Sequence, residues 1–519
     1  MNVPPTRLTR RQLIRSGAWI AGGASVAAAA GTVGYEWQHP QALTEASPRP
    51  AAATPPSDSD DFIKLRSLPD LRPPKLTVVH SRGHTPPSPN RLLFFSPGAY
   101  HTTRPSQDGL MAADPHGRIV WFSPKPQADH VPFDLQVQSY QGSPVLTWWE
   151  GRVTDGTGSG MGYIADATYQ VIKTIQAGNG LTVDLHELNL TPSGSALITA
   201  YRTAEADLSP LGGPRRGQVY ACQAQEVDIA SGKLLFSWDS LAHVPIAETY
   251  NTLPTGPQTA PFDYFHMNSV ALAADGNLLI SSRNTWTIYK VSRTTGDIMW
   301  RLGGKQSDFE IGPGARFYWQ HDVRALSEDK MTIFDDGASP AEELQSRGLL
   351  LELDLSRKLA RLVRAYENPA QLLADNQGSV QVLPDGQVFV GWGNQPYFSQ
   401  FTPDGELVLD GRFPRDIFSY RAFSFPWTGR PGGAPEAAVE ANSTGGATVY
   451  VSWNGATEVH HWVVLTGDEP TSLERVAEAH WAGLETVVTV CRPGKYLAVV
   501  ALDAARHALG RSAVLEVPA

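Results

Sequence analysis

Three histidines precede apolar, strand-like segments at similar points of the chain. His186 lies in the sequence DLHE, His266 in FHMNS and His321 in QHD, and Arg283 ends the segment ISSR that follows the second of them. Neutral imidazoles bind zinc or copper. They also attack electrophilic phosphorus or sulfur, and arginine holds oxyanions through two parallel hydrogen bonds. The residue types therefore predict either a three-histidine metal site or an anion site with a nucleophile, and the arginine favours the anion site because a cation is electrostatically unfavourable beside a metal.

Aromatic side chains accompany these histidines. Phe265 directly precedes His266, and Trp319 lies two residues before His321. Aromatic walls suit a flat phenolic ring, although each of these rings could equally pack in the protein core. One histidine at the start of a strand is usually a packed or solvated residue, so the interpretation as a site depends on all three meeting.

The elements that must position these residues form a repeat. Units of about four short apolar strands, separated by DG, SG and TG turns, recur at roughly 40–60 residues, which is typical of β-propeller blades. A β-sandwich array would not need the same turns at such even spacing. In a propeller the innermost strand of each blade lines the central axis, so residues at its start are expected to converge there. The six copies lie in residues 91–123, 134–177, 186–238, 268–303, 322–366 and 378–413.

The C-terminal part of the chain follows a different pattern. Four alternating apolar segments with NG, GDEP and RPG turns occur after residue 447, which is typical of a small immunoglobulin- or fibronectin-like β-sandwich. Its neighbouring His460 and His461 point to opposite faces of a strand, so they cannot chelate one metal together, and we interpret both as surface residues. The predicted fold class is therefore all-β, a six-bladed β-propeller followed by this sandwich.

Composition limits the classes of function. The formal net charge is −10, which argues against nucleic-acid binding. The two cysteines, Cys222 and Cys491, exclude a disulfide framework and a cysteine-rich metal site, and we interpret both as small buried residues.

The N-terminus resembles a twin-arginine export signal. Residues 9–15 read TRRQLIR, and an uncharged stretch rich in alanine and glycine follows at residues 17–34. A basic tail before a membrane helix is the alternative, but the stretch is short and glycine-rich for a stable span. We expect export by the twin-arginine route to an extracytoplasmic location, with tethering by an uncleaved signal left open. The predicted division of the chain is a signal or anchor over 1–37, a disordered linker over 38–72, the catalytic propeller over 73–430, a linker over 431–447 and the sandwich over 448–519.

The motifs DLHE, FHMNS followed by ISSR, and QHD, placed on successive repeats, resemble the arylsulfotransferase family of exported bacterial enzymes, which do not use an activated nucleotide sulfate. The segment DYFHMNSVALAADGNLLISSRNTWTIYKVSRTTGDIMWRLGG is very close to the central blade of that family. The resemblance covers residues 91–413. The C-terminal sandwich is not part of the family pattern, and the N-terminal β domain and cysteine pair of the bacterial enzymes are missing, which marks a divergent branch.

The resemblance implies a role for each site residue. His321 would be the nucleophile, forming a transient sulfohistidine in a ping-pong transfer from an aryl sulfate to a phenol. His266 and Arg283 would bind the sulfuryl oxygens. His186 would complete the sulfate pocket or assist proton transfer, and Asn268 would donate an amide hydrogen bond to the oxyanion.

The expected partners are an aryl sulfate donor, a phenolic acceptor and the twin-arginine export machinery, with no metal, cofactor or nucleic acid; the oligomeric state stays open. Two alternatives also stay open. One is a non-catalytic exported propeller that binds a ligand or partner, and the other is a metal-dependent hydrolase or lyase that uses the same histidines.

Overall fold

The computed structural model describes residues 61–518 except for 85–87, 89, 100–103, 126–129, 257–259 and 444. The chain divides into two compact units, Met1–Pro50 and Ala51–Ala519, and all described residues belong to the second. The predicted signal or anchor and the first part of the predicted linker, up to residue 60, lie outside the described residues. The rest of that linker is ordered, since the Leu65 side chain is buried and the Ile63 amide donates to the carbonyl of Pro73. The prediction of disorder is wrong for residues 61–72 because their leucines pack against the propeller core.

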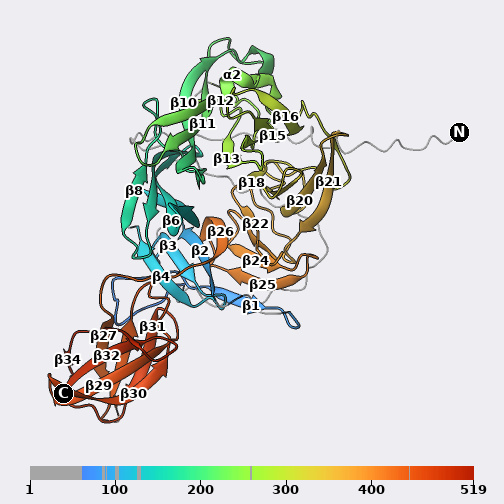
Figure 1. Cartoon of the computed structure of the whole chain (residues 1–519). Coiled ribbons are helices and arrows are strands. Elements are labelled where there is room, and N and C mark those ends of the chain that lie inside the picture. Colours follow the sequence, from blue (N-terminus) through green and yellow to red (C-terminus); the bar gives the residue numbers. More distant parts are fainter. Residues whose placement is uncertain are drawn as a thin grey trace, which may run out of the picture. The chain divides into compact units, whose positions relative to one another are not determined.

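Six sheets of mainly antiparallel strands, each in contact with the next, form the propeller (Figure 1). The all-β prediction is confirmed. Tight turns such as Ala273–Asn277, where Gly276 takes a left-handed φ of +81°, connect neighbouring strands within a blade. Blade 1 contains β26 (Phe418–Pro426), β2 (Arg91–Gly98), β3 (Gly109–Ala113) and β4 (Ile119–Pro124); blade 2 contains β5 (Val131–Tyr140), β6 (Ser143–Thr154), β7 (Thr157–Ala165) and β8 (Val171–Ile175); blade 3 contains β9 (Leu188–Leu190), β10 (Ser195–Ala206), β11 (Gly217–Asp228) and β12 (Leu234–Asp239); blade 4 contains β13 (Met267–Leu272), β14 (Leu278–Ser282), β15 (Thr287–Val291) and β16 (Ile298–Gly303); blade 5 contains β18 (His321–Ala325), β19 (Lys330–Asp335), β20 (Arg347–Asp354), β21 (Leu359–Tyr366) and the short β17 (Glu310–Ile311); blade 6 contains β22 (Ser379–Val382), β23 (Val388–Gly391), β24 (Tyr397–Phe401), β25 (Leu407–Arg412) and β1 (Thr77–His80).

The ring is closed by strands from both ends of the propeller sequence. The inner strand of blade 1 is β26, which pairs with β2 so that Phe94 faces Phe423. The outermost strand of blade 6 is β1, which pairs with β25 so that Val79 faces Asp410. The repeat pattern placed the first blade in residues 91–123 alone and did not show that residues 418–426 complete it. The C-terminal end of the propeller sequence thus supplies a strand to blade 1, and its N-terminal end supplies a strand to blade 6. Backbone hydrogen bonds of these strands hold the ring together.

In the described residues, three short helices lie between strands. The α2 helix (Ser240–His243) follows β12, and the Asp239 side chain caps it by accepting a hydrogen bond from the Leu241 amide. The two 3₁₀ turns are η2 (Ser209–Leu211) and η3 (Ile246–Glu248). No helix in residues 61–518, as far as they are described, is long and apolar enough to cross a membrane.

The C-terminal residues form two sheets with a shared apolar core. Val449 and Val488 of one sheet pack in one cluster with Trp462 and Val499 of the other. This is a β-sandwich. The first sheet contains β27 (Glu436–Ala441), β28 (Ala447–Ser452) and β31 (Glu485–Val490); the second contains β30 (Ser472–His480), β29 (His461–Glu469), β32 (Tyr496–Leu502), β33 (Ala508–Arg511) and β34 (Leu515–Glu516).

The two cysteines differ in environment. Both are free thiols, and Cys222 is buried in the core between blades 3 and 4. Cys491 is exposed, so the interpretation of both as buried residues is wrong for Cys491. It lies directly after β31, where the chain turns at the edge of the sandwich.

Candidate functional site

The three predicted histidines meet at the starts of the inner strands of blades 3, 4 and 5. The ring centroids of His186 and His266 are 4.8 Å apart, and those of His266 and His321 are 6.4 Å apart. Arg283 follows β14 in the same blade as His266, and its amide donates a 2.9 Å hydrogen bond to the His266 carbonyl. The convergence arises because the same position of each repeat is delivered to one axis.

Each histidine forms a hydrogen bond to a carboxylate through its Nδ1 atom. His186 is hydrogen-bonded to Asp184, and His266 to Asp263. His321 Nδ1 lies 2.7 Å from Asp336 Oδ2, and both side chains are buried. A carboxylate on Nδ1 sets the tautomer and orientation of an imidazole, so Nε2 is the ring nitrogen left for chemistry.

His321 is the histidine best suited to act as a nucleophile. Burial, followed by the positive charges of Arg283, His266 and His186, lowers the pKa of His321 well below its ordinary value. Its imidazole is therefore neutral at neutral pH, and the Gln377 amide donates a 3.3 Å hydrogen bond to Nε2, which fits an unprotonated nitrogen there.

Asp336 is the buried acid that orients His321. Burial raises the pKa of Asp336 well above its usual range, against the opposing charge of Arg283. Because the Gln377 amide donates to Nε2, the proton of the neutral ring lies on Nδ1, which donates to Asp336 Oδ2. Nε2 is therefore the unprotonated nitrogen of His321.

The carboxylates of the other two histidines differ in their surroundings. Burial opposes ionisation of Asp184, but the charge of His186 and hydrogen bonds that include the Gly158 amide hold the pKa of Asp184 below its ordinary value. Burial lowers the pKa of His266, and Asp263 opposes this shift. The site therefore combines the neutral imidazole of His321 with the ionised carboxylate of Asp184.

Arg283 supplies the positive charge of the site. Its guanidinium lies 4.8 Å from the centre of the Trp319 ring, and it donates to the carbonyl of Asp375 and to Asn284. Burial lowers the pKa of Arg283, whereas the carboxylates of Asp336, Asp263 and Asp375 raise it. An arginine surrounded by three acids keeps its charge and is held beside the three imidazoles.

The three predicted substrate-binding residues have other contacts. The Asn268 amide donates 2.7 Å to the carbonyl of Gln320, directly before His321. Phe265 is fully buried and packs with Trp238 and Tyr289 in the core. Trp319 is also buried and contacts Arg283. These placements give Asn268 and Trp319 a positioning role and Phe265 a packing role.

Backbone strain marks the same region. His266, Trp319 and Asp322 have φ values between +51° and +57°, in the left-handed region that residues with side chains seldom adopt. Such conformations cluster at functional sites, where the surrounding structure holds them.

An ion network lies one residue further along the inner strands. Arg421 is fully buried and contacts Asp134, Glu187 and Asp322 at 3.0–3.4 Å. Arg324 also contacts Glu187 and Asp322. Asp322 is thus a partner of two arginines and not of His321.

Several residues of the site were not assigned a role from sequence. Asp184 and Asp263 lie two and three residues before their histidines, so their spacing could have revealed them. Asp336 follows β19, fifteen residues after His321, and only the pairing of β18 with β19 brings it back. The Tyr201 ring, 5.9 Å from that of His186, comes from the middle of the twelve-residue β10 and had no sequence signal.

The metal alternative finds no geometric support in the described residues, where no three His, Cys, Asp or Glu side chains are placed to hold one ion.

Residues 136–414 match the family described as Arylsulfotransferase (ASST). The match covers more than half of the chain and includes all three histidines and Arg283, so the chain belongs to the arylsulfotransferase family. Membership supports a sulfotransferase-like role with small aryl substrates. None of the curated proteins matches this chain.

Solved structures resemble the chain only in fold. A protein of unknown function from Bacteroides caccae is 12% identical with a TM-score of 0.40, over 65% of this chain and 99% of its own. A catalytically inactive virginiamycin B lyase from Staphylococcus aureus, solved with quinupristin, is 10% identical with a TM-score of 0.32. The match covers 73% of this chain and 96% of the lyase chain. The β-propeller domain of Cps50 from Myceliophteria thermophila is 16% identical with a TM-score of 0.30. The match covers 60% of this chain and 94% of the Cps50 chain. Likenesses this weak carry no argument about function.

Proposed function

We propose that this protein is an exported aryl-sulfate sulfotransferase, which moves a sulfuryl group from an aryl sulfate to a phenol through a sulfohistidine at His321. The observation that carries the proposal is the pairing of His321 Nδ1 with the buried Asp336, which leaves Nε2 as a neutral nucleophile beside Arg283 and two further imidazoles. The export route rests on the twin-arginine motif at residues 9–15.

In the first half-reaction, His321 Nε2 attacks the sulfur atom of the donor. The N–S bond forms, the S–O bond to the aryl group breaks, and the phenolate leaves with the electron pair of that bond. Arg283 and His266 hold the three sulfuryl oxygens, whose negative charge increases in the transition state. Sulfuryl transfer resembles phosphoryl transfer in that positioning and electrostatics supply most of the catalysis.

In the second half-reaction, the oxygen of a new phenol attacks the same sulfur atom. The O–S bond forms, the N–S bond breaks, and His321 regains its lone pair. The phenolic proton passes to a base, for which His186 is well placed because Asp184 stabilises the imidazolium that results. His186 then passes this proton to a departing phenolate or to water, so the cycle converts one aryl sulfate and one phenol into a new aryl sulfate and a new phenol and needs no further reactant.

The proposal is tested on protein that lacks its first 60 residues, mixed with p-nitrophenyl sulfate and no acceptor. We expect release of one p-nitrophenolate per enzyme and, by peptide mass spectrometry, an adduct with the mass of one SO₃ group on the peptide containing His321. Added phenol should remove the adduct and yield phenyl sulfate. Folded protein that neither releases p-nitrophenolate nor acquires the adduct, across several aryl sulfates, would contradict the proposal.

A matched control is the exposed His460, located just before β29 of the sandwich. His321→Ala should abolish both the burst and the adduct, whereas His460→Ala should change neither. An adduct that persists in His321→Ala would assign it to non-specific sulfurylation of other residues.

A further inference from the structure

A glycine-rich hairpin of blade 2 extends toward the histidine site. Its strands β6 and β7 pair with each other as far as Thr154 and Thr157, whereas the first residue of the inner strand β5 pairs with Gly151. The end of the hairpin therefore reaches past the inner strand of its own blade. The sequence there is TDGTGSGMG, with a glycine at every second position from Gly156 to Gly162.

The base of the hairpin is attached to the segment that carries His186. Gly160 and Val183 exchange two backbone hydrogen bonds of 3.0 and 3.2 Å. The Gly158 amide donates a 2.5 Å hydrogen bond to Asp184, the acid that orients His186. A Cβ atom at Gly158 would lie 2.5 Å from the backbone nitrogen of the residue after Asp184, so only glycine permits this close approach.

The tip of the hairpin lies against the ring of His266. Asp155 and Gly156 form a two-residue turn with φ values of +50° and +75°, as in the type I′ turns that suit hairpins. A Cβ atom at Gly156 would lie 3.7 Å from His266 Cε1, and no other atom of the described residues outside the turn itself lies within 4 Å of that point. Cε1 is bonded to Nε2, the nitrogen that the hydrogen bond to Asp263 leaves for chemistry. A side chain at residue 156 would therefore begin beside the nitrogen that holds a sulfuryl oxygen.

Electrostatics also place the tip next to His266. Burial raises the pKa of Tyr220, and the charges of Asp155 and Asp263 raise it further. Asp263 is the acid paired with His266, so the tip and this acid act on the same tyrosine. Tyr220 lies edge-on to Tyr201 with ring centroids 6.2 Å apart, and the Tyr201 ring lies 6.3 Å from that of His266. The tip, the two tyrosines and His266 are thus neighbours.

We infer that the tip of this hairpin borders the sulfuryl position and that Gly156 keeps the space beside His266 Nε2 open for the sulfate ester. The inference rests on the proposed sulfotransferase function. Residue 156 then determines which donors fit, because a side chain there would reduce the space for the sulfuryl group and a negative charge there would repel it.

The test compares Gly156→Asn with Gly156→Asp through kcat/KM for p-nitrophenyl sulfate, with phenol as acceptor. Asparagine and aspartate have the same shape and both tolerate a left-handed φ, so charge alone separates the two variants. We expect Gly156→Asn to lower kcat/KM about 10-fold through lost space and Gly156→Asp to lower it about 10-fold further through repulsion between like charges. Equal values for the two variants would show that the glycine serves only the turn, and would overturn the inference.

The turn at the opposite end of β6 provides a matched control. Gln141 and Gly142 join β5 to β6 with φ values of +52° and +79°, and a Cβ atom at Gly142 would meet no atom of the described residues within 4 Å, apart from its chain neighbours. Gly142→Asn and Gly142→Asp should both leave kcat/KM unchanged. A difference between these two as large as that at residue 156 would show a general effect of charge and would overturn the inference.

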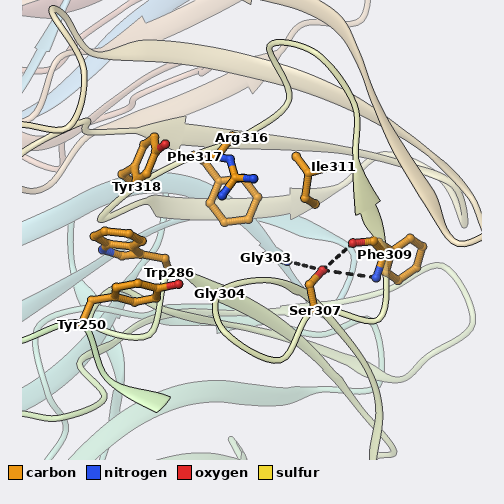
Figure 2. Close-up of a pocket in the computed structure, with 10 residues that line it drawn as sticks. All are labelled: Tyr250, Trp286, Gly303, Gly304, Ser307, Phe309, Ile311, Arg316, Phe317 and Tyr318. Atoms are coloured by element: carbon orange, nitrogen blue, oxygen red, sulfur yellow. Dashed lines mark hydrogen bonds between the residues drawn. The ribbon is translucent and has the colours of Figure 1, made fainter. Parts of the chain in front are cut away.

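A second control places the same charge in an aromatic pocket of blades 4 and 5. Figure 2 shows Ile311 in the lining of this pocket with Trp286 and Phe309, and the lining includes none of the three histidines. Ile311→Asn and Ile311→Asp should therefore give equal kcat/KM values. A charge effect there as large as that of Gly156→Asp would place the donor in this pocket and would overturn the inference.

Failure of the proposed function is distinguishable from failure of the inference. If the unmodified protein does not turn over p-nitrophenyl sulfate, the proposed function fails, and calorimetric titration with sodium sulfate decides about the tip. Sulfate binding that is about 10-fold weaker in Gly156→Asp than in Gly156→Asn would support the inference, whereas equal binding or none would overturn it.

A variant that keeps the turn replaces the Gly156 variants if melting temperatures show that neither folds. Asp155→Asn gives the Asn-Gly pair that type I′ turns favour, and it removes a negative charge beside the site. It should raise kcat/KM for p-nitrophenyl sulfate about 3-fold, because one repulsion of the sulfate ester is lost. An unchanged kcat/KM would overturn the inference.

Discussion

Two groups of three histidines occur in this protein, one at the propeller axis and one in the sandwich. In the sandwich, His461 and His480 face each other across β29 and β30 with ring centroids 4.4 Å apart, closer than the 4.8 Å between His186 and His266. The neighbouring His460 is exposed, whereas His461 is buried, so the interpretation of both as surface residues is wrong for His461. Its ring packs against His480 on the adjoining strand.

The carboxylates show the difference between the two groups. At the axis each imidazole has an acid of its own. In the sandwich the single Glu478 lies 3.1 Å from His461 and also binds Arg475 and Arg506. Proximity of imidazoles is therefore not enough to make a catalytic group. One orienting acid for each ring is what distinguishes the axial site.

The strongest test of this comparison removes one histidine from each group. His321→Ala should lower kcat for sulfuryl transfer by on the order of 10⁴-fold or more, because the covalent route is lost. His461→Ala should leave kcat unchanged. Steady-state release of p-nitrophenolate in the presence of phenol measures both, and a similar decrease in the two variants would contradict the comparison.

The next largest expected effect concerns the acids that lie beside the histidines of the two groups. Asp336→Asn keeps the shape of the side chain but favours the wrong tautomer of His321, and we expect a decrease in the single-turnover rate of sulfurylation of about 10²- to 10⁴-fold. Glu478→Gln in the sandwich should have no effect. A purely structural role for Asp336 would instead lower the melting temperature without a selective decrease in the rate.

Arg283 of the axial site should contribute to kcat through the planar geometry of its guanidinium group. Arg283→Lys keeps a charge but loses the planar fork that binds two oxygens, so we expect kcat to fall by about 10²- to 10³-fold, with KM for the donor changed less. Full activity with lysine would show that charge alone is sufficient.

A stability measurement extends the comparison to the ion pairs. Arg421→Met leaves the buried Asp134 without its ion-pair partner and leaves Glu187 and Asp322 with Arg324 alone, and we expect a loss of about 3–5 kcal/mol in the free energy of unfolding. Arg506→Met breaks an exposed pair in the sandwich and should cost about 1 kcal/mol or less. Melting temperatures by calorimetry measure both, and equal shifts would show that the axial network is not stabilising.

The smallest expected effect concerns the pH dependence of kcat/KM. Because burial and neighbouring cations lower the pKa of His321 below its ordinary value of 6.5, the nucleophile stays neutral as the pH falls through 6.5 and is protonated only at lower pH. The acidic limb of kcat/KM for p-nitrophenyl sulfate should therefore lie below pH 6.5. A limb at or above that pH would contradict the assigned environment of His321.

The sequence alone was enough to determine the blades and the positions of the site histidines. Both are local properties: DG-type turns and apolar alternation define the strands, and each histidine directly precedes an inner strand of its own repeat. The repeat also placed Arg283 near the axis, because it ends the strand that pairs with the strand following His266.

Only the tertiary structure decided what surrounds these residues. The pairing of His321 with Asp336, the burial of Phe265 in the core and the completion of blade 1 by β26 all depend on contacts between residues separated in sequence. The same holds for Arg421, which meets Asp134 from the opposite end of the propeller sequence. Periodicity shows which face of a strand a residue occupies, but the partner on that face is set by how the blades close around the axis.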